Sequence, residues 1–150
     1  MTSLLTPSVP ISWGELLDKI TILEIKRERI DVAEARDNVL REHGLLLEVG
    51  APGLRRAGVA PLLQALKAVN EQLWEIEDAI RGKEAEGNFG DGFVKLARSV
   101  YRMNDRRAAL KRRINLLLRS ELIEEKSYAR YARPHSAALV QAQQAPTAAP

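Results

Sequence analysis

Cysteine is absent from this chain of 150 residues. That absence excludes disulfides, thiolate nucleophiles and cysteine-ligated zinc or iron–sulfur centres, and it fits a reducing compartment. Aromatic residues make up only 5% of the chain. The core must therefore be aliphatic, which favours helices over a β-sandwich rich in Val, Thr and Tyr.

Long hydrophobic runs and targeting signals are also missing. No apolar run approaches the roughly 20 residues that span a membrane. The first ten residues lack a basic region and contain Pro7 and Pro10, so we do not expect a signal peptide. We therefore expect a soluble protein in the cytoplasm.

The sequence motifs of several catalytic classes are missing as well. There is no phosphate-binding glycine loop, no dinucleotide fingerprint and no Gly-x-Ser-x-Gly. The two histidines, His43 and His135, lie far apart, and no Glu-x-x-His pair exists. We expect no metal and no cofactor, and the sequence leaves open whether the protein is an enzyme.

Apolar residues recur at helical spacing over most of the chain. Ser12-Trp-Gly-Glu15 forms a capping box that predicts the start of a first helix. Asp31, with Glu34 three residues later, is a second candidate N-cap. We therefore expect a kink or break near residues 30–32, after which a second helix should run to about residue 48. Gly50-Ala-Pro-Gly53, with Gly58 after it, predicts a loop over residues 50–60.

The strongest periodic signal is a heptad seam, in which apolar residues step by four and three alternately. A short turn follows it, with Asp91 as the expected N-cap of the next helix, so the two helices should be antiparallel neighbours. The seam comprises Leu62, Leu66, Val69, Leu73, Ile76 and Ile80.

These signals predict an all-α fold, an antiparallel helical bundle of coiled-coil character. It should be built on a long α-hairpin of about residues 61–86 and 91–120, with an N-terminal helix or kinked helix pair over 12–48. We expect residues 1–11 to form a flexible arm and 12–131 a single helical domain. The Ala/Gln/Pro tail at 132–150 has too little apolar surface to order itself.

Charged and amide side chains interrupt the apolar stripes of these helices. A projection at about 100° per residue places them within or beside the stripes. If all stripes face one interior, these side chains meet there. The set is Glu24, Arg27, Glu77, Arg81, Asn104, Arg107 and Lys111.

Two interpretations of this set stay open. The charges could pair with one another, since removing one partner from a buried ion pair costs about 3–5 kcal/mol. Alternatively, an excess of bases could leave a cationic site for an anionic small molecule such as a phosphate, nucleotide sugar or dicarboxylate. An unpaired Lys111 would favour the second interpretation.

A basic stripe on the last long helix offers a further alternative. It could follow nucleic-acid phosphates, but no aromatic residues interleave with it, and the preceding helix carries an acidic face of Glu71, Glu75 and Asp78. We therefore do not expect a nucleic-acid partner. Apolar residues off the main stripes favour a homo-oligomer or another protein partner. The basic stripe comprises Lys95, Arg102, Arg106 and Arg113, and the off-stripe residues are Ile22, Ile25 and Trp74.

Five segments together resemble a family of short bacterial helical proteins known only as a domain of unknown function. They are residues 11–26, 69–81, 96–107, 111–115 and the run Glu124-Glu-Lys-Ser-Tyr128. The resemblance implies a bacterial cytoplasmic setting and a link to glycan or lipopolysaccharide glycosyltransferases. Combined with the residues, it leads us to expect a non-enzymatic helical binding or adaptor protein with a charged set inside its bundle. The alternative is an enzyme or sensor that binds an anion there.

Overall fold

The computed structural model describes residues 1–129, so the prediction for the tail at 132–150 lies outside the described part. Within it the chain forms helices and no strands, which confirms the all-α prediction. Residues 1–11 form neither helix nor strand. The helices are α1 (Trp13–Arg29), α2 (Ala33–Leu54), α3 (Val59–Ala85) and α4 (Asp91–Leu117).

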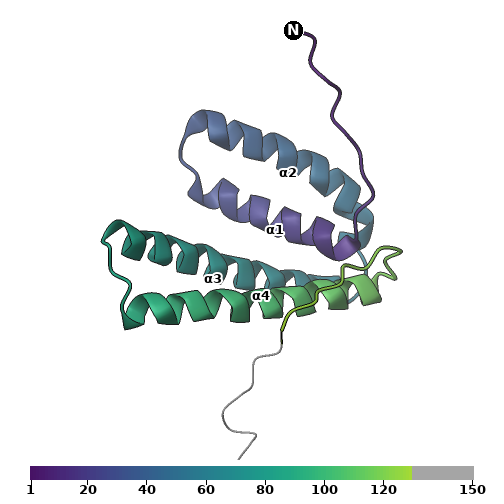
Figure 1. The fold of residues 1–150 in the computed structure, drawn as a ribbon. Coiled ribbons are helices and arrows are strands. Elements are labelled where there is room, and N and C mark those ends of the chain that lie inside the picture. Colours follow the sequence, from purple (N-terminus) through teal and green to yellow (C-terminus); the bar gives the residue numbers. More distant parts are fainter. Residues whose placement is uncertain (130–150) are drawn as a thin grey trace, which may run out of the picture.

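Helix α1 begins where the capping signal predicts. The Ser12 hydroxyl accepts a hydrogen bond from the Glu15 backbone N–H at 3.1 Å, which satisfies one of the free donors of the first turn. The predicted break at 30–32 is confirmed, and α1 and α2 pack side by side as a first hairpin (Figure 1). Val32 occupies the N-cap position of α2 without a side-chain hydrogen bond, so the prediction of a cap at Asp31 was wrong.

The predicted loop at 50–60 is shorter in the structure, because α2 continues through its glycines to Leu54. An added Cβ at Gly50 would lie 2.7 Å from the Ile20 side chain, and one at Gly53 would lie 2.6 Å from the Trp13 ring. The two glycines, three residues apart, therefore lie on the face of α2 that packs closely against α1, and they do not break the helix. Only residues 55–58 connect α2 to α3.

Helices α3 and α4 form the predicted long hairpin, shifted by a few residues at its ends. Gly58 precedes α3 with a left-handed φ of 85°, a conformation that glycine adopts without strain. At the other end Gly90 is the N-cap of α4 and Asp91 is its first residue. The prediction of Asp91 as the cap was therefore wrong by one position.

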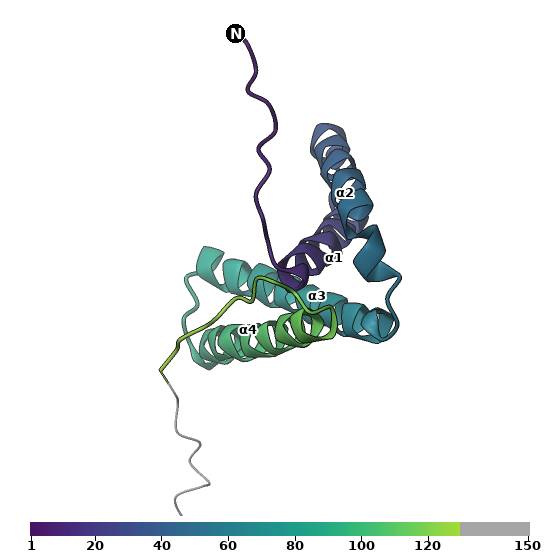
Figure 2. The same ribbon diagram turned by 90° about the vertical axis from the view of Figure 1, so that its right-hand side faces the viewer.

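Helix α1 lies at the centre of the molecule, in contact with α2 on one side and with the α3–α4 hairpin on the other (Figures 1 and 2). Its second apolar face is used, since Ile25 is only 1% exposed. The core is aliphatic, as the scarcity of aromatic residues predicts. Its buried members are Leu16, Leu17, Ile20, Val59, Leu66 and Ile114.

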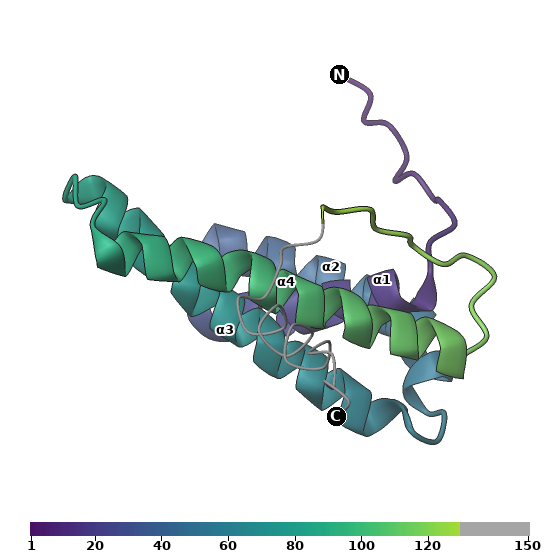
Figure 3. The same cartoon turned by 60° about the horizontal axis from the view of Figure 1, so that its bottom comes forward.

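After α4 the chain turns back and runs alongside this helix as residues 119–129, here named the strap (Figures 1 and 2). Arg119 makes the turn with a positive φ of 51°. At the opposite end the α3–α4 hairpin projects beyond α1 and α2 (Figure 3). None of the helices in residues 1–129 is long and apolar enough to cross a membrane.

Candidate functional site: a paired charge network beside a cleft

The first turn of α1 is anchored on the end of α4. The Gly14 N–H donates to Asn115 Oδ1 at 2.6 Å, and the Trp13 N–H donates to Ser120 Oγ at 3.1 Å. A Cβ at residue 14 would lie 2.5 Å from the Lys111 carbonyl oxygen, so only glycine permits this approach. The contact brings polar side chains of α1 within reach of the charged side chains of α4.

Asp18 is the most buried charged residue in this region, at 1% exposure. Its carboxylate accepts hydrogen bonds from Arg107 through Nε, at 2.9 Å, and through Nη2. Asn70 Nδ2 donates to Asp18 Oδ1 and to Thr21 Oγ1, each at 2.9 Å. The hydrogen bond to Asp18 raises the pKa of Arg107 despite the opposing effect of burial. The buried carboxylate is therefore paired and held by three helices.

Lys111 lies one turn further along α4 and is also buried. Its Nζ donates to Glu15 Oε2 at 2.6 Å and to Glu124 Oε2 at 2.9 Å. Burial opposes its charge, but the hydrogen bonds to both carboxylates outweigh burial and raise the pKa of Lys111. Glu15, expected to complete the capping box, instead directs its carboxylate to Lys111 and, at 3.4 Å, to Lys19.

Two ion pairs hold the strap against α4. Besides the bond from Glu124 to Lys111, Glu125 Oε1 accepts from Arg112 Nη1 at 3.0 Å. Lys126 Nζ lies 2.6 Å from Glu124 Oε1. Hydrogen bonds from Lys126 and Lys111 lower the pKa of Glu124 to about 2. The Glu124 carboxylate is therefore the charged group that ties the strap to the network.

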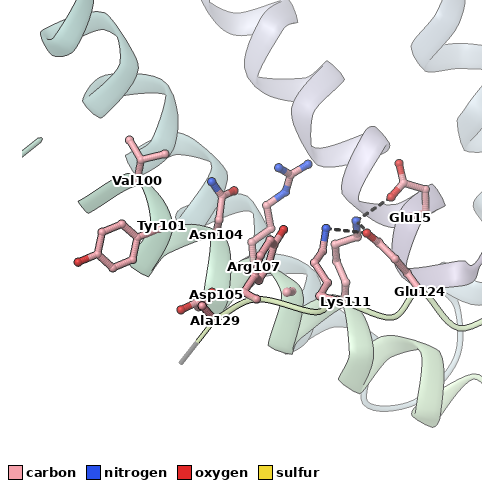
Figure 4. A pocket seen from close by; sticks show the side chains of 12 residues that line it. Glu15, Val100, Tyr101, Asn104, Asp105, Arg107, Lys111, Glu124 and Ala129 are labelled. Carbon is pink, nitrogen blue, oxygen red and sulfur yellow. Dashed lines mark hydrogen bonds and ion pairs between the residues drawn. The ribbon is translucent and has the colours of Figure 1, made fainter. Parts of the chain in front are cut away.

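A cleft of about 860 Å³ lies between α4, the start of α1 and the strap. Figure 4 shows Lys111 reaching from α4 toward Glu15 and Glu124 and Arg107 pointing up toward α1, with Tyr101 and Asn104 further along the helix. The charged lining residues are three acids and three bases, so the cleft is balanced and not cationic. They are Glu15, Asp105 and Glu124 against Arg107, Lys111 and Lys126.

The structure brings together only part of the residue set expected from the sequence. Asn104, Arg107 and Lys111 line the cleft, and Arg107 and Lys111 belong to the network. The other four lie outside both, because α1 crosses from α4 toward α3 and does not cover the far half of the hairpin. Arg27, Glu77 and Arg81 are exposed, and Glu24 is half-buried beside Lys67 and His43.

The partners of Arg107 and Lys111 were not singled out from the sequence. Asp18 lies on the same side of α1 as Ile22 and Ile25, the apolar residues opposite the main stripe. That second apolar face was the signal that Asp18 faces packed structure. Glu15 was not predicted as a partner of Lys111 because it was interpreted as a capping residue. Glu124 was not predicted because it lies in a segment without helical periodicity.

His43 forms a separate polar site between α2 and α1. The residue is 5% exposed, and its Nε2 has no hydrogen-bond partner. The nearest carboxylate oxygen, Glu24 Oε1, lies 3.9 Å away, beyond hydrogen-bond range. Lys67 Nζ draws the other Glu24 oxygen to 3.7 Å and lies 2.8 Å from Glu28 Oε1. Across residues 1–129, no three His, Asp or Glu side chains gather as a metal-ligand set.

A family of unknown function, DUF6165, matches residues 8–140. The chain belongs to this family. The matched range contains the whole charge network, the cleft and the strap. No curated protein and no solved structure matches the chain.

Proposed function

We propose that this member of the family is a non-enzymatic helical binding protein, an adaptor that takes a segment of a partner protein into the cleft beside the strap. The observation that carries the proposal is that each base lining the cleft has a carboxylate partner within the chain. Charges that are already paired in this way hold the helices and the strap in place. The other residues that line the cleft are then the ones that contact the partner protein.

The rest of the lining suits a protein partner. Tyr101 and Tyr128 are 39% and 69% exposed, and Asn104 and Asp105 add polar groups at the edge. Tyrosine beside satisfied polar residues is typical of protein recognition surfaces, because it offers a large apolar area and few rotamers to immobilise. A cleft of about 860 Å³ accommodates several side chains.

The resemblance to the bacterial family implies that related segments accompany proteins of glycan and lipopolysaccharide assembly. We therefore propose a glycosyltransferase of that kind as the partner. The cytoplasm of a bacterium is the proposed setting.

Photocrosslinking in cells tests the adaptor proposal. A benzoyl-phenylalanine at Tyr128, which keeps an aromatic ring at the cleft, should give one discrete protein adduct. The same residue at Val49, 62% exposed on the outer side of α2, is the matched control and should give none. Mass spectrometry of the adduct then tests the link to glycan assembly. Absence of an adduct at Tyr128, or equal adducts at both positions, contradicts the proposal.

The second candidate function is binding of an anionic small molecule in the same cleft. The observation that favours it is the presence of three bases in the lining, of which Lys126 is on the exposed strap. Phosphate, nucleotide sugars and dicarboxylates should then raise the melting temperature by binding the native state. Lys126→Gln is the informative variant, because Arg107→Ala would unpair the buried Asp18 and test stability first. A saturable shift that Lys126→Gln removes favours this function over the adaptor.

A further inference from the structure

The outer half of the α3–α4 hairpin lacks a covering layer. The same heptad seam runs through both halves, and in the inner half Leu66 is fully buried and Leu73 is 8% exposed. Residues 76–103 are all described, and none of them is buried. Figures 1 and 3 show the reason, since this half projects beyond α1 and α2. Apolar seam residues are therefore left partly open to water.

A groove of about 340 Å³ lies on this hairpin between the two helices. Gln72 at its edge is about 160° around α3 from Asn70, which contacts α1, at 100° per residue. The groove therefore lies on the side of the hairpin away from Asn70 and its contact with α1. Its floor is apolar and its edge polar, formed by Ile76, Leu96 and Met103 with Gln72, Glu75 and Ser99.

Charges of opposite sign flank the groove. The acidic bank on α3 consists of Glu71, Glu75, Asp78 and Glu86, and the basic bank on α4 consists of Lys95, Arg102, Arg106 and Arg113. Among the described residues, no ion pair joins α3 to α4. Within the acidic bank, Glu75 pairs with Arg29 of α1 at 3.2 Å and Glu71 pairs with Lys67 at 3.8 Å, and among the described residues Asp78 and Glu86 have no ion pair. The two banks therefore do not neutralise each other within one chain, and Asp78 and Glu86 are the acids left for a second copy.

We propose that a second copy of this chain docks groove to groove on this surface, forming an antiparallel four-helix bundle. A two-fold axis parallel to the hairpin places α4 of one copy over α3 of the other, so each basic bank meets an acidic bank. A two-fold axis across the hairpin would instead place the basic bank of one copy against the basic bank of the other. The surface is thus self-complementary in one arrangement, as an isologous dimer requires.

The size of the surface fits this occupant. Helices of 27 residues are about 40 Å long and about 10 Å wide, so the hairpin face covers roughly 800 Å², the usual contribution of each partner to a stable interface. Helices α1 and α2 lie on the opposite face and do not obstruct the second copy. The proposal goes beyond the adaptor function, because the cleft beside the strap takes no part in it.

Sedimentation of the full-length protein provides the first test, with a mass of twice 16.7 kDa expected. Reversing the basic bank with Lys95→Glu, Arg102→Glu and Arg106→Glu should weaken the dimer at least tenfold. Adding Asp78→Lys and Glu86→Lys should restore most of it, because the acids without a partner in their own chain then match the reversed basic bank. Glu75 is left unchanged, because it pairs with Arg29 of the same chain. The control, Arg36→Glu, Arg41→Glu and Arg56→Glu, changes the same charge on exposed residues outside the hairpin and should leave the dimer intact.

The relative orientation of the two copies gives a second and independent test. Because the chain has no cysteine, a single introduced cysteine can be labelled specifically. A spin label on Asn88→Cys, in the turn of the hairpin, should lie within about 25 Å of its counterpart, because both turns are at the same end of the dimer. With the axis across the hairpin the turns would be about 40 Å apart, one helix length. A monomer at all concentrations, a dimer unaffected by the charge exchange, or the longer distance overturns the proposal.

Discussion

Replacement of Arg107 by alanine tests how the charge network contributes to the fold. The variant removes both guanidinium bonds to Asp18, whose carboxylate is 1% exposed. Asn70 remains as a single neutral donor. A buried carboxylate with one remaining partner is destabilising, because neither water nor a cation replaces the lost bonds.

The expected loss is near the lower end of the range for breaking a buried pair, about 3 kcal/mol, since the Arg107 side chain itself is 29% exposed. That is a large part of the 5–15 kcal/mol that stabilises an ordinary domain, and it should lower the melting temperature by about 10 °C. Arg107→Lys should recover only part of this, because an ammonium cannot form the bidentate bond.

Urea unfolding followed by circular dichroism gives the free energies. Arg112→Ala is the matched control, because it breaks the exposed pair with Glu125 on the same helix and should cost almost nothing. Asp18→Asn in the Arg107→Ala background removes the stranded charge and should restore about half of the loss. An Arg107→Ala variant that is no more destabilised than Arg112→Ala would refute a stabilising role for the Arg107–Asp18 pair.

Three further outcomes follow from the structure. Gly14→Ala should cost about 1–3 kcal/mol in urea unfolding, because its Cβ would meet the Lys111 carbonyl, whereas Gly44→Ala, with open space around it, should gain up to about 1 kcal/mol. The pKa of Glu124, lowered from 4.5 to about 2, predicts that docking of the strap persists above pH 4.5 and weakens as pH falls toward 2. Amide exchange should show this, and Glu124→Gln should remove the dependence. His43→Leu should raise the melting temperature by a few degrees, since it removes a buried nitrogen without a partner; a lowered melting temperature would contradict this.

Helix positions and the long hairpin were predictable because they depend on local periodicity. The heptad seam from Leu62 to Ile80 predicts the position of α3 independently of the elements that pack on it. The short turn before Asp91 predicts that the next helix, α4, lies antiparallel to α3. Gly50 and Gly53 misled because glycine weakens an isolated helix. Here the close contact with Trp13 and Ile20 overrides that tendency.

The candidate site was only partly predictable, because projection onto a wheel assumes that every stripe is covered along its whole length. That assumption holds for Arg107 and Lys111, which α1 and the strap cover. It fails for Glu77 and Arg81, on the half of the hairpin that α1 does not reach. The contact between Lys111 and Glu124 on the strap requires the chain to reverse direction after α4, and no periodic pattern in the sequence predicts that reversal.

The most direct test of the account is the reactivity of Lys111 in the folded protein. Competitive acetylation with peptide mass spectrometry measures each lysine amine against the others, and exposed Lys95 on the same helix is the reference. A closed network predicts that Lys111 is the slowest lysine in the native protein, because Glu15 and Glu124 enclose and charge-stabilise its amine, and that it matches Lys95 in urea. A native Lys111 that reacts as fast as Lys95 would mean an open cationic site and would contradict the account.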